Sequence, residues 1–304
     1  MTVGSPFDSR AQALNVKRQW REWSGFFASS AYAAHHEIEV NAIRNAAAII
    51  DVSPLFKYRV SGPDAQRLVD RVITRDATKL ARGQVYYTPW CDEHGKVIDD
   101  GTVSRLDDDS YRWTAADAQI RWLRLNARGL DVTVEETSER VASLALQGPL
   151  SRDVLEAATG ESFADLRYFR RRASRVGDID IDVSRTGYTG DLGYELWADA
   201  ARASDLWDAL METGRSWALR PAGMLALDVV RVEAGLILLC FVVILDTFFY
   251  ATGIPKDSDE LPFLRDVWGA LNGTVIVPFF RESIIPVFMT VFAFFVPTAI
   301  SGLY

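Results

Sequence analysis

The segment SRTGYTGDLGYELW, residues 184–197, is the most specific stretch of this 304-residue chain. Gly187, Gly190 and Gly193 recur every third residue, a spacing that allows positive φ angles and close approach of the backbone to a ligand. Glu195 follows at the start of an apolar stretch. A carboxylate beside such a turn can accept two parallel hydrogen bonds from an amino group and an adjacent ring N–H, the edge that guanine-like and pterin rings present. The alternative is a tight hairpin whose glutamate faces water.

A second unusual stretch, GKVIDDGTVSR at residues 95–105, places Asp99 and Asp100 side by side among apolar and β-branched residues. These neighbours predict a strand, although aspartate is disfavoured in strands. Successive side chains of a strand point to opposite faces, so only one of the two carboxylates can face the interior. The alternative is that both are turn or edge residues.

The composition excludes several classes of function. A formal net charge of -8 argues against general nucleic-acid binding, which needs clustered Lys and Arg. Two cysteines exclude a disulfide framework and a zinc ribbon, and fit a reducing compartment. With three histidines, neither a catalytic triad nor a histidine-rich metal site is expected, and we assign no metal ligand. No GxGxxG, GxxxxGK[ST] or GxSxG motif is present.

Up to about residue 239 the chain alternates amphipathic helices with short strands. One helical face is expected to comprise Ile38, Ala42, Ile43, Ala46 and Ile50. Further helices are expected within residues 61–73, 117–128, 149–160 and 203–214. Strands are expected at residues 85–89, 96–106, 110–114, 130–136, 141–148 and 178–185. Interleaved helices and antiparallel strands, without regular βαβ spacing, predict an α+β fold.

The composition changes sharply after Leu239. Residues 235–254 carry a single charge, Asp246, and residues 283–304 carry none. Each stretch is long enough to cross a hydrocarbon core of about 30 Å as a helix. The sequence therefore predicts two membrane spans joined by a polar segment, the alternative being two buried elements of a soluble domain.

Five blocks, in order and with matching spacing, resemble the glycine-cleavage T-protein, aminomethyltransferase. They are DVSPLFKYRVSGPDA (51–65), GKVIDD (95–100), LALQGP (144–149), SRTGYTGDLGYEL (184–196) and RVEAGL (231–236). The resemblance covers about residues 30–239 and extends to folate-dependent demethylases and to the folate domains of sarcosine- and dimethylglycine-oxidising enzymes. It implies a cytoplasmic, tetrahydrofolate-binding α+β domain that acts on one-carbon units.

The resemblance also implies roles for individual residues. Asp100 matches the aspartate that faces the folate and is the expected catalytic residue, which handles a proton or developing positive charge. Glu195 matches the glutamate that holds the pterin edge. The remaining expected folate contacts are Tyr87, Tyr188 and Leu55. Arg231 also matches a family position, but a structural ion pair is the preferred interpretation.

Several positions depart from the T-protein pattern. Leu227 stands where a GARD-like stretch carries an arginine, and Thr114 and Asp117 stand in the region of a VNAAN-like stretch. These changes favour a relative that uses a small methylated donor over one that uses an aminomethyl-lipoyl carrier protein. The KGCYxGQE-type motif of iron–sulfur-assembly relatives is absent, and nothing after Leu239 resembles the family's C-terminal β-barrel.

The sequence thus predicts an N-terminal extension (1–34), a folate-binding domain that is truncated relative to the family (35–239) and a hydrophobic tail (240–304) whose first span begins near residue 235. The expected activity is tetrahydrofolate-dependent aminomethyl or methyl transfer. The alternative is a catalytically inactive, membrane-tethered folate-binding remnant or fusion product. The folded part is expected in the cytoplasm, anchored to the membrane if the tail spans it.

Overall fold

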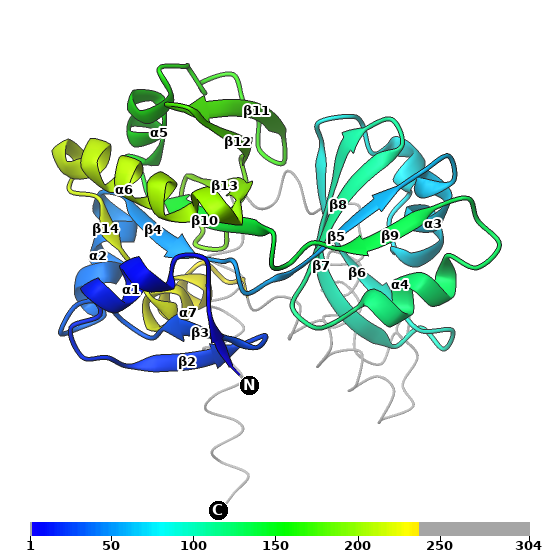
Figure 1. Ribbon diagram of the computed structural model, residues 1–304, viewed down its shortest axis with the longest axis horizontal. Coiled ribbons are helices and arrows are strands. Elements are labelled where there is room, and N and C mark those ends of the chain that lie inside the picture. Colours follow the sequence, from blue (N-terminus) through cyan, green and yellow to red (C-terminus); the bar gives the residue numbers. More distant parts are fainter. Residues whose placement is uncertain (1, 237–304) are drawn as a thin grey trace, which may run out of the picture. The chain divides into compact units, whose positions relative to one another are not determined.

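The computed structural model of the protein describes residues 2–236, and one compact unit spans residues 1–235 (Figure 1). Apart from Gly235 and Leu236, the two expected membrane spans, 235–254 and 283–304, lie outside the described residues. Among the residues that are described, no helix is long and apolar enough to cross a bilayer. The expected tail therefore stays a prediction.

A six-stranded sheet forms the first half of the unit, with strand order β11-β12-β13-β10-β4-β14. Its pairs are antiparallel except β14 with β4. The strands are β4 (Ala48–Asp51), β10 (Val141–Gln147), β11 (Arg171–Val176), β12 (Ile179–Ser184), β13 (Gly193–Asp199) and β14 (Arg220–Pro221). The helices around it are α1 (Asp8–Leu14), α2 (Glu37–Asn45), α5 (Ser151–Thr159), α6 (Ala203–Thr213) and α7 (Met224–Glu233).

The two apolar clusters of this half follow the alternation of the strands. Leu144 and Leu146 of β10 pack in one cluster with residues of α5 and α6. Ala145, between them in the sequence, packs in another cluster with residues of α2 and α7. Because successive strand residues point to opposite faces, the sheet is buried on both sides at β10.

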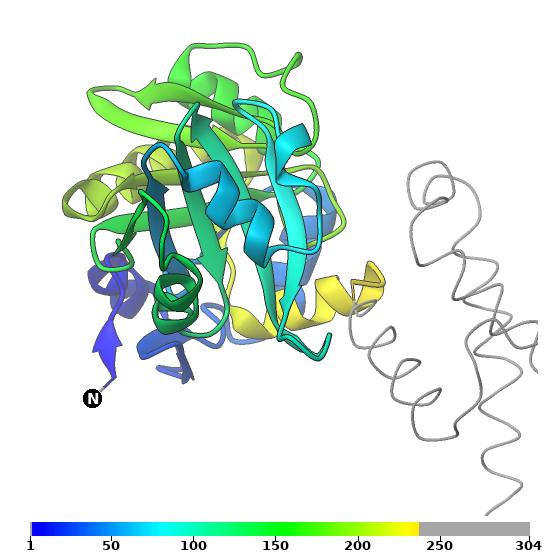
Figure 2. The same ribbon diagram turned by 90° about the vertical axis from the view of Figure 1, so that its right-hand side faces the viewer.

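A five-stranded antiparallel sheet forms the second half, with strand order β6-β7-β8-β5-β9. Its strands are β5 (Phe56–Ser61), β6 (Val85–Cys91), β7 (Val97–Asp107), β8 (Ser110–Ala115) and β9 (Thr133–Glu136). Helices α3 (Ala65–Val72) and α4 (Ile120–Asn126) lie against one face, as Figure 2 shows. That face carries the apolar cluster that includes Val103, Tyr111 and Trp113. The opposite face carries polar side chains and forms part of the candidate site.

The first 34 residues, set apart as an extension in the sequence, pack into the compact unit. They form α1 and a small sheet of β1 (Val3–Gly4), β2 (Trp20–Trp23) and β3 (Phe26–Ser29). Phe7, Ala11 and Tyr32 are buried in the same cluster as Leu144 of β10. Short 3₁₀ helices cover Ala77–Lys79, Ala200–Arg202 and Gly214–Trp217.

The α+β prediction is confirmed, and the predicted strands are all present. The predicted helical face from Ile38 to Ile50 is wrong, because α2 ends at Asn45 and Ile50 lies in β4. Ala46 leaves helical geometry at φ -140° and ψ -116°, and Ile50 then pairs with Ala145. A run of Ala and Ile fits the period of a helix as well as that of a strand. Pairing with β10 makes this run a strand.

Candidate functional site

The adjacent aspartates of β7 point to opposite faces of the five-stranded sheet. Asp99 is buried and accepts hydrogen bonds from the backbone N–H of Asp100 (2.8 Å) and of Asp117 (3.0 Å), and from Gln119 Nε2 (3.2 Å). Burial raises the pKa of the Asp99 carboxyl, and these backbone hydrogen bonds oppose the shift. Asp99 therefore fixes the segment after β8, while Asp100 lies on the polar face.

Asp100 is half-buried and pairs across the sheet with Pro89 of β6. The Tyr87 hydroxyl donates a hydrogen bond to its carboxylate. Burial and the adjacent Asp100 raise the pKa of Tyr87, with a smaller contribution from Tyr188, so Tyr87 remains a donor at neutral pH. Both rings are partly exposed, Tyr87 by 40% and Tyr188 by 44%. Three predicted site residues, Asp100, Tyr87 and Tyr188, thus come together.

Arg231 of α7 lies beside this group. Its guanidinium carbon is 5.9 Å from the centre of the Tyr188 ring, and its Nε donates to Asp228 at 3.1 Å. The predicted ion pair is therefore present, and it holds the arginine against one of the predicted pocket residues.

Leu55 lies in the turn between β4 and β5 and is half-buried. The turn is organised by Lys57, whose side chain is fully buried and whose Nζ donates to the carbonyls of Ser53 (2.6 Å) and Leu55 (2.8 Å). Burial lowers the pKa of Lys57 to about 8, against the attraction of Asp51. Leu55 packs against the cluster of Ile43 and Ile50, and no described contact joins it to Asp100 or Glu195.

Glu195 lies in β13 of the six-stranded sheet and is half-buried. Thr186 Oγ1 donates to its Oε2 at 2.7 Å. Burial raises the pKa of the Glu195 carboxyl, and the hydrogen bond from Thr186 and the positive charge of Arg112 act in the opposite direction. The carboxylate is thus turned towards the interior and does not face water as a simple hairpin would place it.

Arg112, which the sequence analysis did not single out, joins the two sheets. It lies on β8 and its Nη1 is 2.8 Å from Asp182 Oδ2 of β12. Its guanidinium carbon lies 4.2 Å from the centre of the Trp197 ring. Its Nε and Nη2 atoms are buried without a hydrogen-bond partner, an arrangement that costs about 1–3 kcal/mol per group. In the sequence, SYRWTA (110–115) alternates polar residues with aromatic or apolar ones, and this alternation is the signal that could have identified Arg112. In the structure every residue of this strand is buried, so its polar residues form a polar face inside the protein.

The polar face of the five-stranded sheet links these two parts of the site. Thr102 of β7 pairs with Tyr87, and Ser104 pairs with Arg112, so the four residues share one face. Thr102 also exchanges a hydrogen bond of 2.6 Å with Thr114 of β8. The face therefore runs from Asp100 and Tyr87 across the threonines to Arg112, which bridges to the sheet that carries Glu195.

The three glycines of residues 184–197 lie close to other parts of the protein. A Cβ at Gly187 or Gly193 would overlap the side-chain amide of Gln147, and neither residue has a positive φ. Gly190 has φ +79°, and a Cβ there would overlap Ala234. Close approach to Gln147 and to Ala234 thus requires glycine at these positions, the predicted positive φ is present at Gly190, and close approach to a ligand stays a prediction.

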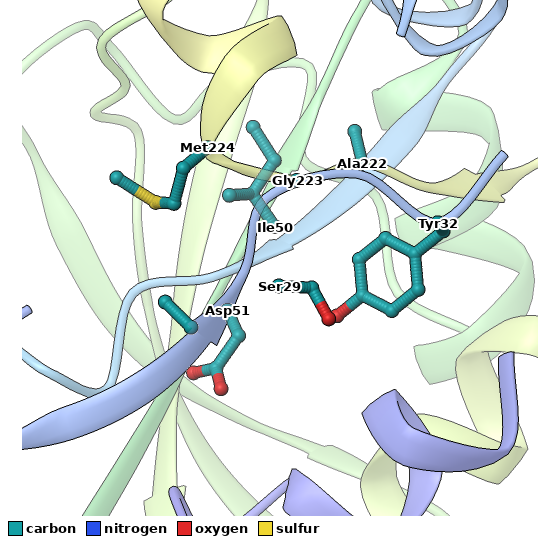
Figure 3. A pocket seen from close by; sticks show the side chains of 8 residues that line it. Ser29, Tyr32, Ile50, Asp51, Ala222, Gly223 and Met224 are labelled. Atoms are coloured by element: carbon teal, nitrogen blue, oxygen red, sulfur yellow. The ribbon is translucent and has the colours of Figure 1, made fainter. Parts of the chain in front are cut away.

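A small cavity elsewhere in the unit is distinct from this constellation. It has a volume of about 10 Å³, about the space that one water molecule needs, and is lined by Ala28, Ser29, Tyr32, Ile50, Asp51, Ala222, Gly223 and Met224 (Figure 3). This volume is below the roughly 300–1,000 Å³ of typical ligand pockets. None of the five predicted site residues lines it, so it does not mark the candidate site.

The departures from the T-protein pattern can also be located. Leu227 is buried in the apolar cluster of α2 and α7, with Ile43 and Ile50. Asp117 donates its backbone N–H to Asp99. Within residues 2–236 no group of three His, Cys, Asp or Glu side chains could hold a metal ion.

Comparison with known proteins places this chain in a family. The family model of the GCVT N-terminal domain matches residues 8–240, and the chain belongs to that family. It is 39% identical over 228 residues to the trimethylamine-oxide aldolase of Ruegeria pomeroyi, covering 71% of this chain and 29% of that protein. It is 36% identical over 203 residues to the aminomethyltransferase of Caldanaerobacter subterraneus subsp. tengcongensis, covering 65% and 54%.

The fold is also found among solved structures. Glycine cleavage system aminomethyltransferase T from Bartonella henselae is similar with a TM-score of 0.68 and 26% identity, over 76% of this chain and 62% of that one. The resemblance inferred from the five sequence blocks is therefore confirmed. The chain spans about half or less of the length of these curated relatives.

Proposed function

We propose that this domain binds tetrahydrofolate and serves one-carbon transfer, of an aminomethyl or a methyl group. The observation that carries the proposal is the arrangement of Asp100 and Tyr87 on one polar face, with Tyr188 of the loop before β13 nearby and Arg112 connecting that face to Glu195. Membership of the GCVT N-terminal domain family and the similarity to aminomethyltransferases support it.

The residues present fit a flat heterocycle with N–H groups along one edge. Glu195 supplies a carboxylate that is partly withdrawn from water, which strengthens hydrogen bonds from an amino group and a ring N–H. Tyr87 and Tyr188 offer ring surface that is still exposed, which suits contact with an aromatic ligand. When bound, tetrahydrofolate supplies the nitrogen that receives the one-carbon unit.

Asp100 is the proposed catalytic residue. Its carboxylate is held by the Tyr87 hydroxyl on the face that the ligand would occupy. With tetrahydrofolate bound, it would accept the proton that the folate nitrogen loses when it bonds to the one-carbon unit, or would balance the positive charge that develops there. Asp99, next to it, is committed to three N–H donors and has a structural role.

For the one-carbon donor we propose a small methylated amine. The relative from Ruegeria pomeroyi is named for an activity on trimethylamine oxide and is 39% identical. The aminomethyl-lipoyl carrier protein is the other candidate donor, because relatives named aminomethyltransferase are 36% identical. Assays that compare small N-methylated compounds with aminomethyl-loaded carrier protein distinguish the two.

Isothermal titration with tetrahydrofolate tests the ligand assignment. We expect wild type to bind at least tenfold more tightly than the Asp100→Asn, Glu195→Ala double variant. An Asp180→Asn variant, whose exposed carboxylate pairs with Arg175 and not with Arg112, serves as a folding control. Equal affinity of wild type and the double variant would overturn the assignment.

A catalytically inactive folate-binding protein is the second candidate. Leu227, an apolar residue where the T-protein pattern has an arginine, favours it. Folate binding without turnover of any aminomethyl, N-methyl, S-methyl or O-methyl donor would support this candidate, and measured transfer to tetrahydrofolate would exclude it. Its membrane tether is tested separately, because recovery of the full chain without detergent would contradict anchoring.

A further inference from the structure

Arg112 is held between the two sheets by contacts with two residues, Asp182 and Trp197. Its Nη1 pairs with Asp182 at 2.8 Å, and its guanidinium lies over the Trp197 ring at 4.2 Å. Asp182 also pairs with Arg171, whose Nε is 2.6 Å from its other carboxylate oxygen. One carboxylate therefore serves two arginines, and the charge of the cluster is not balanced within it.

The sheet register places Glu195 beside this cluster. Asp182 of β12 pairs with Trp197 of β13, and Ser184 pairs with Glu195 two residues along. Because alternate residues share a face, these four side chains lie on the same side of the six-stranded sheet. Arg112 contacts Asp182 and Trp197 on that side, so its positive charge lies next to the Glu195 carboxylate.

Within residues 2–236, the other groups that act on the Glu195 carboxyl carry no positive charge. Thr186 donates a hydrogen bond to it, and Ser184 contributes a weaker one. Tyr168, from the loop before β11, interacts with it electrostatically, and burial raises the pKa of that phenol. Arg112 is the cation that opposes the effect of burial on the Glu195 carboxyl.

We propose that Arg112 is a positioning residue that keeps Glu195 ionised, so that the site accepts N–H donors from its ligand. The inference rests on the proposed function. A neutral glutamic acid would present one O–H and would lose one of the two parallel hydrogen bonds that an amino group and ring N–H can donate. Through its effect on Glu195, and without contact with the ligand, Arg112 thereby determines which edge of a ligand ring the site recognises.

The test compares Arg112→Met with the matched control Arg171→Met. Both remove an arginine from the same aspartate, but only the first removes the cation beside Glu195. Tetrahydrofolate affinity is titrated calorimetrically from pH 5 to pH 8. Loss of the cation raises the pKa of Glu195, so we expect Arg112→Met to bind at least tenfold more weakly at pH 7. The tetrahydrofolate affinity of Arg112→Met should reach the wild-type value only at a pH about one unit higher. The affinity of Arg171→Met should equal that of wild type at each pH.

A ligand-free measurement separates this inference from the proposed function. Carboxyl ¹³C NMR, with the Glu195 signal assigned by its loss in Glu195→Gln, gives the titration midpoint of Glu195 directly. We expect an upward shift in Arg112→Met and restoration of the midpoint in Arg112→Lys. An unshifted midpoint in Arg112→Met would overturn the inference even if folate binds. If Arg112→Met does not fold, Arg112→Lys takes its place in the test. A tenfold or greater loss of tetrahydrofolate affinity in folded Arg112→Lys, with an unchanged titration midpoint of Glu195, would also overturn the inference.

Discussion

The two acidic parts of the candidate site are built in different ways. Asp99 and Asp100 adjoin each other in β7, and strand alternation sends one carboxylate to the core and the other to the polar face. Glu195 depends on Thr186, from the loop before its own strand, and on Arg112, from the other sheet. The first arrangement is local and is readable from the sequence. The second exists only once the two sheets come together.

The largest expected effect concerns catalysis at Asp100. In Asp100→Asn we expect the rate of one-carbon transfer to fall by about 10²–10⁴-fold, the usual contribution of a positioned acid or base. Folate affinity should change by less than about threefold, since Glu195 is intact. Single-turnover kinetics and calorimetry measure the two quantities. If folate affinity falls together with the transfer rate, Asp100 binds the ligand as Glu195 does, and the assignment of separate catalytic and binding roles to the two residues is wrong.

Asp99 should be the more important of the two adjacent aspartates for stability. Asp99→Ala leaves the part-buried N–H of Asp117 and the buried amide of Gln119 without their acceptor, which should lower the free energy of unfolding by about 2–3 kcal/mol. Asp100→Ala, on the half-buried face, should cost less than about 1 kcal/mol. Urea denaturation of both variants measures this difference, and equal losses would contradict the division of roles.

Lys57 gives the turn at Leu55 a dependence on pH. Its folded-state pKa of about 8 lies below its ordinary value of 10.5, so the unfolded chain holds the proton over this interval while the folded protein releases it. Stability of wild type relative to Lys57→Met should therefore rise by roughly 1–3 kcal/mol between pH 7.5 and pH 10.5. Denaturant titrations of both proteins across this range measure it. A constant difference would show that the lysine keeps its ordinary pKa.

The smallest expected effect concerns the hydroxyl of Tyr87. Tyr87→Phe removes the hydrogen bond to Asp100 but keeps the ring surface. We expect the transfer rate to fall by about three- to tenfold, because one hydrogen bond contributes about 1 kcal/mol. Stability should change by less than about 0.5 kcal/mol, since the side chain is 40% exposed. A rate equal to that of wild type would show that Asp100 does not need this partner.

Some features of the protein follow from the sequence alone. The alternation of β7 implies that Asp99 and Asp100 must face opposite ways, and the five ordered blocks predict the family. Gly160, at φ +72°, ends α5 where the sequence places the end of that helix. These are local properties, because strand alternation and a helix cap depend on residues a few positions apart.

Tertiary structure decided the rest. Residues 48–50 fit a helix or a strand, and pairing with β10 makes them a strand. The glycines of residues 184–197 fit a ligand loop, but the side chain of Gln147 occupies the space beside Gly187 and Gly193. Arg112 is one polar residue in a short strand until Asp182 and Trp197 of the other sheet surround it. In each case the deciding partner is distant in the sequence, and the pattern of neighbouring residues carries no information about it.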